Sequence, residues 1–250
     1  PMLLILSLVQ NAAALTVADL AEGDLVVSEV MTNPAAVSYF RGEWIEIYNN
    51  SGAEVDLEDL VVSDSGSDSF TISGSLTVAA GDYVVLGVRS NSAVNGGATV
   101  DYQYSRSDMA LGTGTDSVIL SYSGTTFDSV TWDNGTTFPD PVGATLSLDP
   151  GALDATSNDS GGNWCEPYNT FGDGDYGSPG SANDDCPVDL STAVAGDLVI
   201  AEVMVNPSMV TYFRGQWFEV YNNSSTYWNL DGLDVEDAGS DIFTVSGELY

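Results

Sequence analysis

Aspartates are concentrated in turn-like stretches of the chain, where their oxygens could bind a cation. Asp64 and Asp68 enclose a Ser-Gly-Ser turn, and Asp173 and Asp175 flank a single glycine. Calcium takes six to eight oxygen ligands, which Asp, Asn and backbone carbonyls often supply in loops of this kind. Neither stretch contains a complete twelve-residue calcium loop. The pattern therefore leaves two interpretations, a calcium site at these four aspartates or solvated turn residues.

Two glutamates and an arginine form a second candidate group. Glu29, Arg41 and Glu46 lie near one another in the sequence, and Arg41 follows a Tyr-Phe pair. Paired carboxylates can perform glycosidase chemistry, but the sequence offers no sign of a sugar-binding cleft. We expect a structural ion pair of Arg41 with Glu46, or an arginine stacked on the aromatic pair, rather than a ligand site. The same interpretation applies to Arg214 and Glu219, which repeat the pattern.

The overall composition restricts the chemistry further. The 250 residues include no histidine, which removes the usual general base and the commonest transition-metal ligand. There are 37 acidic residues against four basic ones, for a net charge of −33. Such a field repels nucleic acid and anionic membranes and attracts cations and basic partners. We therefore expect neither an enzyme nor a nucleic-acid-binding protein.

Two features indicate export from the cell. Residues 2–14 are mostly apolar and end in three alanines, a pattern typical of a signal peptide and too short for a comfortable membrane-spanning helix. Cys165 and Cys186 bracket a loop rich in Gly, Asp, Tyr and Pro. In an exported chain such a pair predicts a disulfide, with two free thiols as the alternative. We expect a secreted or cell-surface protein that is not integral to the membrane.

Short alternating runs of β-branched and aromatic residues dominate the chain from Gly23 onward. Examples are residues 25–30, 44–48 and 83–86, separated by Gly, Asp, Asn and Ser about every ten residues. Alternation with a period of two places Ile45 and Ile47 on one face of a strand. The pattern predicts an all-β fold, an antiparallel β-sandwich without long helices.

An internal repeat divides the chain. Residues 23–77 match residues 196–250 at a constant offset of 173, with 32 identities in 55 positions. A period of this length indicates duplicated domains rather than a solenoid. We expect a signal peptide at 1–14, a linker at 15–22, a sandwich at 23–186, a linker at 187–195 and an incomplete second copy at 196–250. That copy would hold only the opening strands of a sandwich, with open edges and an uncovered core. We expect it to be completed by the continuing polypeptide, with a strand donated by another subunit as the alternative.

The segments 24–34 and 43–49 resemble the opening of bacterial lamin-tail domains. Residues 111–120 and 128–132 are similar to the central hairpin of that family, and 163–164 with 177–183 to its closing signature. The resemblance implies an immunoglobulin-like sandwich used as an extracellular module, without catalytic residues. Nuclear lamin tails have been associated with chromatin contacts. This chain differs from them, because 37 acidic residues against four arginines disfavour binding to nucleic acid.

These observations predict a non-catalytic structural, adhesive or binding module of a surface protein. We expect its partners to be other protein domains, subunits of the same chain or a cell-surface ligand, with assembly into arrays or fibres as one form. The alternative is an accessory binding domain of a larger secreted hydrolase.

Overall fold

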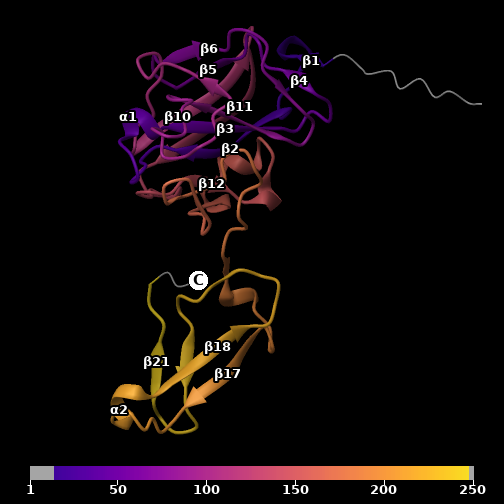
Figure 1. The fold of residues 1–250 in the computed structure, drawn as a ribbon. Coiled ribbons are helices and arrows are strands. Elements are labelled where there is room, and N and C mark those ends of the chain that lie inside the picture. Colours follow the sequence, from indigo (N-terminus) through magenta and orange to yellow (C-terminus); the bar gives the residue numbers. More distant parts are fainter. Residues whose placement is uncertain (1–13, 248–250) are drawn as a thin grey trace, which may run out of the picture. The chain divides into compact units, whose positions relative to one another are not determined.

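The computed structural model describes residues 14–247, which fall into two units (Figure 1). The first unit ends at Cys186 and the second begins at Pro187. Most of the predicted signal peptide lies outside the described residues. Each unit is treated below by itself.

The larger sheet of the first unit has six strands in the order β13-β12-β2-β3-β8-β9. Its centre is the antiparallel pair β2–β3, and every residue of β2 is buried. Because both faces of this pair are covered, β2 is largely apolar instead of alternating. The strands are β2 (Leu25–Met31), β3 (Trp44–Asn49), β8 (Tyr83–Gly87), β9 (Tyr102–Gln103), β12 (Leu146–Leu148) and β13 (Trp164–Cys165).

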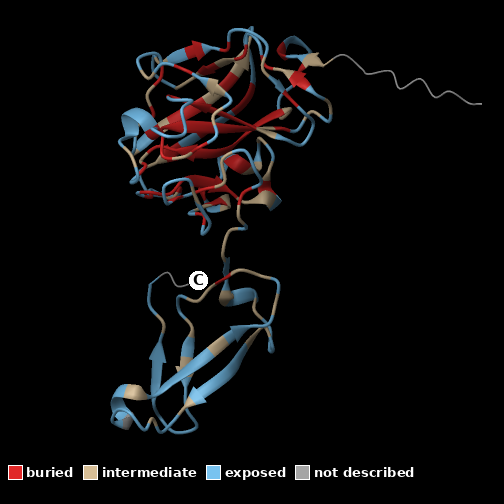
Figure 2. Cartoon of the chain, viewed as in Figure 1, coloured by how far each residue is buried: buried red, intermediate tan, exposed pale blue. Residues whose placement is uncertain are grey.

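A four-stranded sheet covers one face of the larger sheet. Its order is β11-β10-β5-β6, and its long β10–β11 hairpin turns at Ser123 and Gly124, both with positive φ. The strands are β5 (Val61–Ser63), β6 (Ser69–Thr71), β10 (Thr115–Tyr122) and β11 (Thr125–Asp133). Valine, isoleucine, leucine and aromatic side chains from both sheets form one continuous buried core. The predicted all-β sandwich is therefore confirmed, and Figure 2 shows the core in red.

Small elements complete the first unit. They are β1 (Leu15–Thr16), β4 (Val55–Asp56), β7 (Thr77–Val78), β14 (Thr170–Phe171), β15 (Asp175–Tyr176), the helix α1 (Tyr39–Gly42) and short 3-10 turns at 17–19, 150–152, 157–159 and 161–163. Within residues 14–247, no α-helix exceeds four residues. The pairs β1–β4 and β8–β9 are parallel, so the sandwich is not strictly antiparallel.

The predicted linkers are wrong. Residues 15–22 contain β1 and a 3-10 turn, and Val17 and Leu20 are buried in the core. They belong to the sandwich because β1 pairs with β4 and their apolar side chains pack inside it. Residues 187–195 likewise contain β16 (Val188–Asp189) and a 3-10 turn of the second unit.

The second unit repeats the opening elements of the first at the offset of 173. Its elements are β16, a 3-10 turn at 190–192, β17 (Leu198–Met204), α2 (Tyr212–Gly215), β18 (Trp217–Asn222), β19 (Trp228–Asn229), β20 (Asp234–Glu236) and β21 (Ile242–Thr244). The pairs β16–β19, β17–β18 and β20–β21 have the same partners and register as β1–β4, β2–β3 and β5–β6. Figure 2 shows this unit mostly exposed, whereas the equivalent strands of the first unit are buried.

Candidate functional site

Two buried glutamates lie at the centre of the larger sheet, on the face opposite the main core. Glu29 of β2 and Glu46 of β3 are direct cross-strand partners, next to an irregularity in register between Val27 and Glu29. Both side chains have no solvent exposure. A pair of carboxylates in this position costs free energy unless hydrogen bonds and protonation compensate for it.

Hydrogen-bond donors converge on both carboxylates. The hydroxyls of Thr145 and Ser147 donate to Glu29 Oε1 over 2.6 and 2.8 Å. The hydroxyl of Ser28 donates to Glu46 Oε1 over 2.7 Å. These donors come from β2 and from the segment around β12, so the sheet itself builds half of the site.

The other half comes from residues 177–183, here named the strap. The strap lies across the glutamates, and the backbone amides of Ser178 and Gly180 donate to Glu29 and Glu46 over 3.0 and 2.7 Å. Asn183 fastens its far end by donating to the carbonyls of Ser28 and Leu148. The two glutamates therefore bind the closing segment of the sandwich to the larger sheet by hydrogen bonds.

Burial raises the pKa values of both glutamates. Burial raises the pKa of Glu29 to about 7, and the hydrogen bonds from Thr145 and Ser147 oppose that rise. Burial, and then the charge of Glu29, raise the pKa of Glu46 well above its ordinary value. Two adjacent buried carboxylates resist ionising together, so the pair retains a proton to higher pH than exposed glutamates do.

The predicted ion pair of Arg41 with Glu46 is wrong. Arg41 is exposed, while Glu46 is buried and bonded to the strap. The ion pair in the described part of the chain joins Arg106 to Glu43, with Nε to Oε2 at 2.9 Å. Local spacing suggested Arg41, but the fold brings in an arginine 63 residues from its partner.

Arg106 is also the arginine that stacks on the aromatic pair Tyr39 and Phe40. Its guanidinium lies 4.9 Å from the ring centre of Tyr39 and 4.6 Å from that of Phe40. The sequence interpretation had Arg41 stack on this pair, whereas the structure places the distant Arg106 there. In the second unit Gln216 stands at the position of Glu43, and it donates to the carbonyl of Val205. No ion pair joins Arg214 to Glu219 among residues 14–247.

The aspartates of the calcium prediction have structural partners. Asp64 accepts the amides of Gly66 and Asp68 and so closes its own turn. Asp175 is buried, and its Oδ1 accepts the amides of Ala35 and Ala36 over 3.0 Å. In the described part of the chain, no group of three or more acidic, cysteine or histidine side chains is placed to bind a metal ion together. Calcium binding by Asp64, Asp68, Asp173 and Asp175 stays a prediction.

The predicted disulfide is confirmed. Cys165 of β13 and Cys186 are bonded, with Cα atoms 5.6 Å apart. The closed loop contains the whole strap and the β14–β15 hairpin. Phe171 of this hairpin packs against Met31, Trp44 and Val85, which extends the cover over the face that carries the glutamates.

In the second unit the equivalent face and the equivalent core are open. Glu202 and Glu219 are the counterparts of Glu29 and Glu46 and are exposed. On the other face, the counterparts of the completely buried Val27 and Ile45 are Ile200 and Phe218, which are 61% and 37% exposed. The described residues of the second unit correspond to residues 14–74 of the first, so the segments that cover these positions in the first unit have no counterpart among them.

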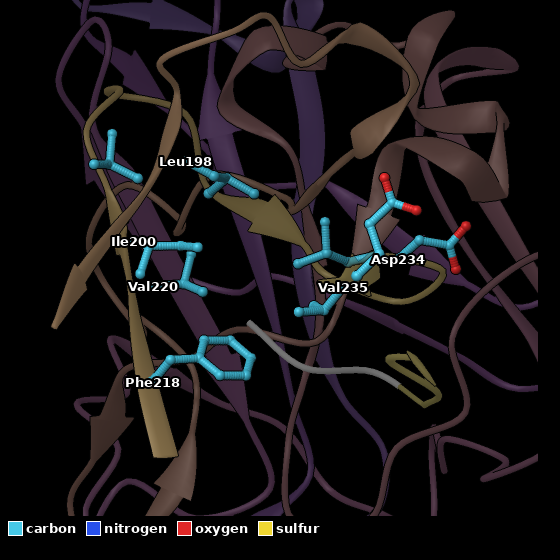
Figure 3. A pocket seen from close by; sticks show the side chains of 9 residues that line it. Leu198, Ile200, Phe218, Val220, Asp234 and Val235 are labelled. Atoms are coloured by element: carbon cyan, nitrogen blue, oxygen red, sulfur yellow. The ribbon is translucent and has the colours of Figure 1, made fainter. Parts of the chain in front are cut away.

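A hollow of about 240 Å³ lies between the two hairpins of the second unit. Figure 3 shows Leu198, Ile200, Phe218 and Val220 gathered on one wall and Val235 opposite them. The carboxylate of Asp234 lies at its margin, and Glu236 also lines the hollow. This hollow occupies the place that the core occupies in the first unit.

Sequence reasoning missed three functional contributors: the strap as partner of the glutamates, the hydroxyls of Thr145 and Ser147, and Arg106. The strap was recognised only as a closing motif. No local signal connects any of these residues to β2 or β3, because 63 to 149 residues separate the partners.

Comparison with known proteins supports the fold assignment. Residues 19–134 match the sequence profile of the Lamin Tail Domain family. This match covers β2 to β11, which includes the whole four-stranded sheet, four strands of the larger sheet and Glu29, Glu43 and Glu46. A comparison with curated proteins gave no match. Residues 19–134 of the first unit therefore match a lamin tail domain, an immunoglobulin-like module of a non-enzymatic family.

Proposed function

We propose that this protein is an extracellular structural or binding component of a cell surface, which assembles with other protein domains. One observation carries the proposal. Residues 19–134 form part of a β-sandwich and match the Lamin Tail Domain, an immunoglobulin-like and non-enzymatic family.

The first unit supports a structural role. Its buried glutamates accept hydrogen bonds from the protein itself, so they serve the fold rather than a reaction. Its other large buried cluster is an apolar core. A sandwich of this kind is suited to a structural or binding role.

The disulfide and the charge support a location outside the cell. Disulfides persist in oxidising compartments, and Cys165–Cys186 closes the final segment of the first unit. A net charge of −33 keeps a protein soluble at high salt and disfavours nucleic acid as a partner. Among residues 14–247, none of the helices is long and apolar enough to span a membrane.

The location can be tested by digesting intact cells that produce the protein with trypsin. Trypsin is suitable because the chain contains four arginines and no lysine, and both Arg41 and Arg214 are exposed. We expect cleavage after Arg214 in intact cells, abolished by R214Q. Protein that is cut only after lysis would contradict an extracellular location.

The assembly can be tested on protein extracted without denaturant. We expect particles several times larger than a single copy of the polypeptide. Copurification with a hydrolase at fixed stoichiometry would favour the accessory-domain alternative instead. A monomer in native extracts would contradict assembly.

A further inference from the structure

The chain contains two Asn-Gly steps, Asn95-Gly96 and Asn134-Gly135. In such a step the side-chain amide can be lost without an enzyme. The backbone nitrogen of the glycine attacks the Cγ atom of the asparagine, and the absence of a glycine side chain leaves this approach open. The side chain and the backbone must both rotate for the attack. The surroundings of each asparagine therefore decide whether it reacts in the folded protein.

Asn95 is buried and fixed by its neighbours. Its Nδ2 donates to the carbonyls of Arg89 and Ala98 over 2.9 and 3.0 Å. Its Oδ1 accepts the amide of Gly97 over 3.0 Å, and Gly97 lies against Gly172 with no room for a Cβ atom between them. The side-chain amide can rotate only after these hydrogen bonds break, so the folded chain protects Asn95.

Asn134 lies in an exposed turn directly after β11. Residues 134–137 are all exposed, and the Asn134 side chain makes no hydrogen bond with any other residue that the structure describes. The amide of Gly135 likewise donates no hydrogen bond within residues 14–247. Asn134 and Gly135 both have positive φ, 59° and 72°, a combination typical of tight Asn-Gly turns. Both reacting groups are therefore accessible to each other and to water.

The residues that follow this step are tied to the core. The carboxylate of Asp133 accepts three backbone amides from residues 136–138. The ring of Phe138 is buried and packs against Trp164, with ring centres 5.8 Å apart. These contacts set the path of the backbone from β11 into the core. An additional backbone atom at Asn134 would change that path.

We propose that Asn134 is a self-modification site of this protein. The backbone nitrogen of Gly135 loses its proton to solvent and forms a bond to Cγ of Asn134, while the Cγ–Nδ2 bond breaks and ammonia leaves. Water then adds to either carbonyl carbon of the cyclic succinimide and opens it. One opening gives aspartate, and the other gives isoaspartate, in which the main chain runs through the former side chain. The net reaction consumes water and releases ammonia, without any change in oxidation state.

The modification gives the protein a property beyond a structural or binding role, a chemical record of its age. Each event adds one negative charge at the end of β11. Isoaspartate also lengthens the main chain immediately before the turn that Asp133 and Phe138 hold. The reaction requires only water, so it does not depend on where the protein is located.

The test follows the full folded chain during incubation for weeks at neutral pH. Tandem mass spectrometry of the reduced tryptic peptides then locates each converted residue. Trypsin cleaves after arginine, which places Asn95 in residues 90–106 and Asn134 in residues 107–214. We expect conversion at Asn134 to exceed that at Asn95 by more than about tenfold, because Asn95 reacts only through local opening of the fold.

The same chain, reduced and kept in denaturant, is the first control. Without the fold both Asn-Gly steps are exposed, so Asn95 and Asn134 should convert at rates within about threefold of each other. N134Q is the second control, because the longer side chain must close a larger and less favourable ring. Folded N134Q should show no conversion at position 134 over the same time.

The structural consequence has its own readout. As isoaspartate accumulates, the thermal midpoint of the wild type should fall during incubation, because the longer main chain disturbs the seat of Phe138 against Trp164. The midpoint of N134Q, compared with its own fresh preparation, should fall less. An isoaspartate-specific methyltransferase should label residues 107–214 of the incubated wild type more strongly than those of N134Q.

Equal conversion of Asn134 and Asn95 in the folded chain would overturn the proposal. The same holds if Asn134 converts in denaturant but not in the folded chain, since the turn would then hold Asn134 as firmly as Asn95 is held. Equal losses of thermal midpoint in the wild type and N134Q, with isoaspartate present in the wild type, would overturn the consequence for Phe138.

Discussion

Glu29 and Glu46 face each other across β2 and β3 as two completely buried carboxylates, and the strap closes over them. Neither carboxylate takes part in an ion pair in the described part of the chain. The stability of the first unit therefore depends on the protonation of this pair.

The first prediction concerns pH. In the folded chain the pKa of Glu29 is about 7, whereas in the unfolded chain it is near the ordinary value of 4.5. Unfolding between these values releases a proton, so the free energy of unfolding falls as pH rises from about 4.5 to 7, then levels off. Glu29 alone accounts for roughly 3 kcal/mol. Asp128, whose pKa is raised to about 6 by burial, acts in the same direction.

Denaturant unfolding of the wild type and of E29Q across pH 4 to 9 checks this. E29Q removes the carboxyl group that titrates between pH 4.5 and 7 and should reduce the loss of stability across that window. The other titratable groups near the pair are Tyr48 and Tyr83, and burial raises the pKa of Tyr83 to about 12, so it stays neutral throughout. Equal slopes for both proteins would show that the pair does not control the pH dependence.

The second prediction concerns Arg106. Its removal leaves Glu43 buried and unpaired, so R106A should lower the free energy of unfolding by about 3 kcal/mol. Exposed Arg41 is the matched control, and R41A should change the free energy of unfolding by less than about 0.5 kcal/mol. Burial still raises the pKa of Glu43 despite the arginine. The double variant R106A/E43Q should recover part of the loss, and no recovery would argue against an electrostatic cause.

The third prediction concerns the disulfide. Replacing Cys165 and Cys186 with serine opens a loop with a sequence separation of 21, which should cost about 3 kcal/mol. Hydrogen–deuterium exchange should increase first in the strap, because its amides then depend on the two glutamates alone. Exchange that increases uniformly over both sheets would show that the disulfide does not act on the strap.

The fourth prediction concerns the contact of Gly97 with Gly172. A Cβ atom at Gly97 would collide with the backbone of Gly172, whereas one at Gly74 would meet open space. Both glycines have φ between 80° and 95°, so alanine strains the backbone similarly at each. G97A should therefore destabilise the first unit by about 2 kcal/mol more than G74A. Equal thermal midpoints of the two variants would mean that the segment 170–176 moves away without cost.

The sequence by itself determined the fold class, the disulfide and the duplication. Alternation of residues such as Ile45 and Ile47 specifies strands because side chains of a strand point alternately to its two faces. The offset of 173 predicted each element of the second unit, since the same residues make the same local contacts. The repeat also places Ile200 and Phe218 at the positions of Val27 and Ile45.

Only the tertiary structure decided which distant residues form hydrogen bonds or ion pairs with the buried glutamates. The local pattern paired Arg41 with Glu46, but the chain folds so that Glu46 faces the strap and Arg106 reaches Glu43. Residues 15–22 were expected to be a linker, yet Val17 and Leu20 enter the core once β1 pairs with β4. Local spacing constrains neighbours along the chain, whereas a sandwich is closed by contacts between segments more than a hundred residues apart, and only the completed packing selects among them.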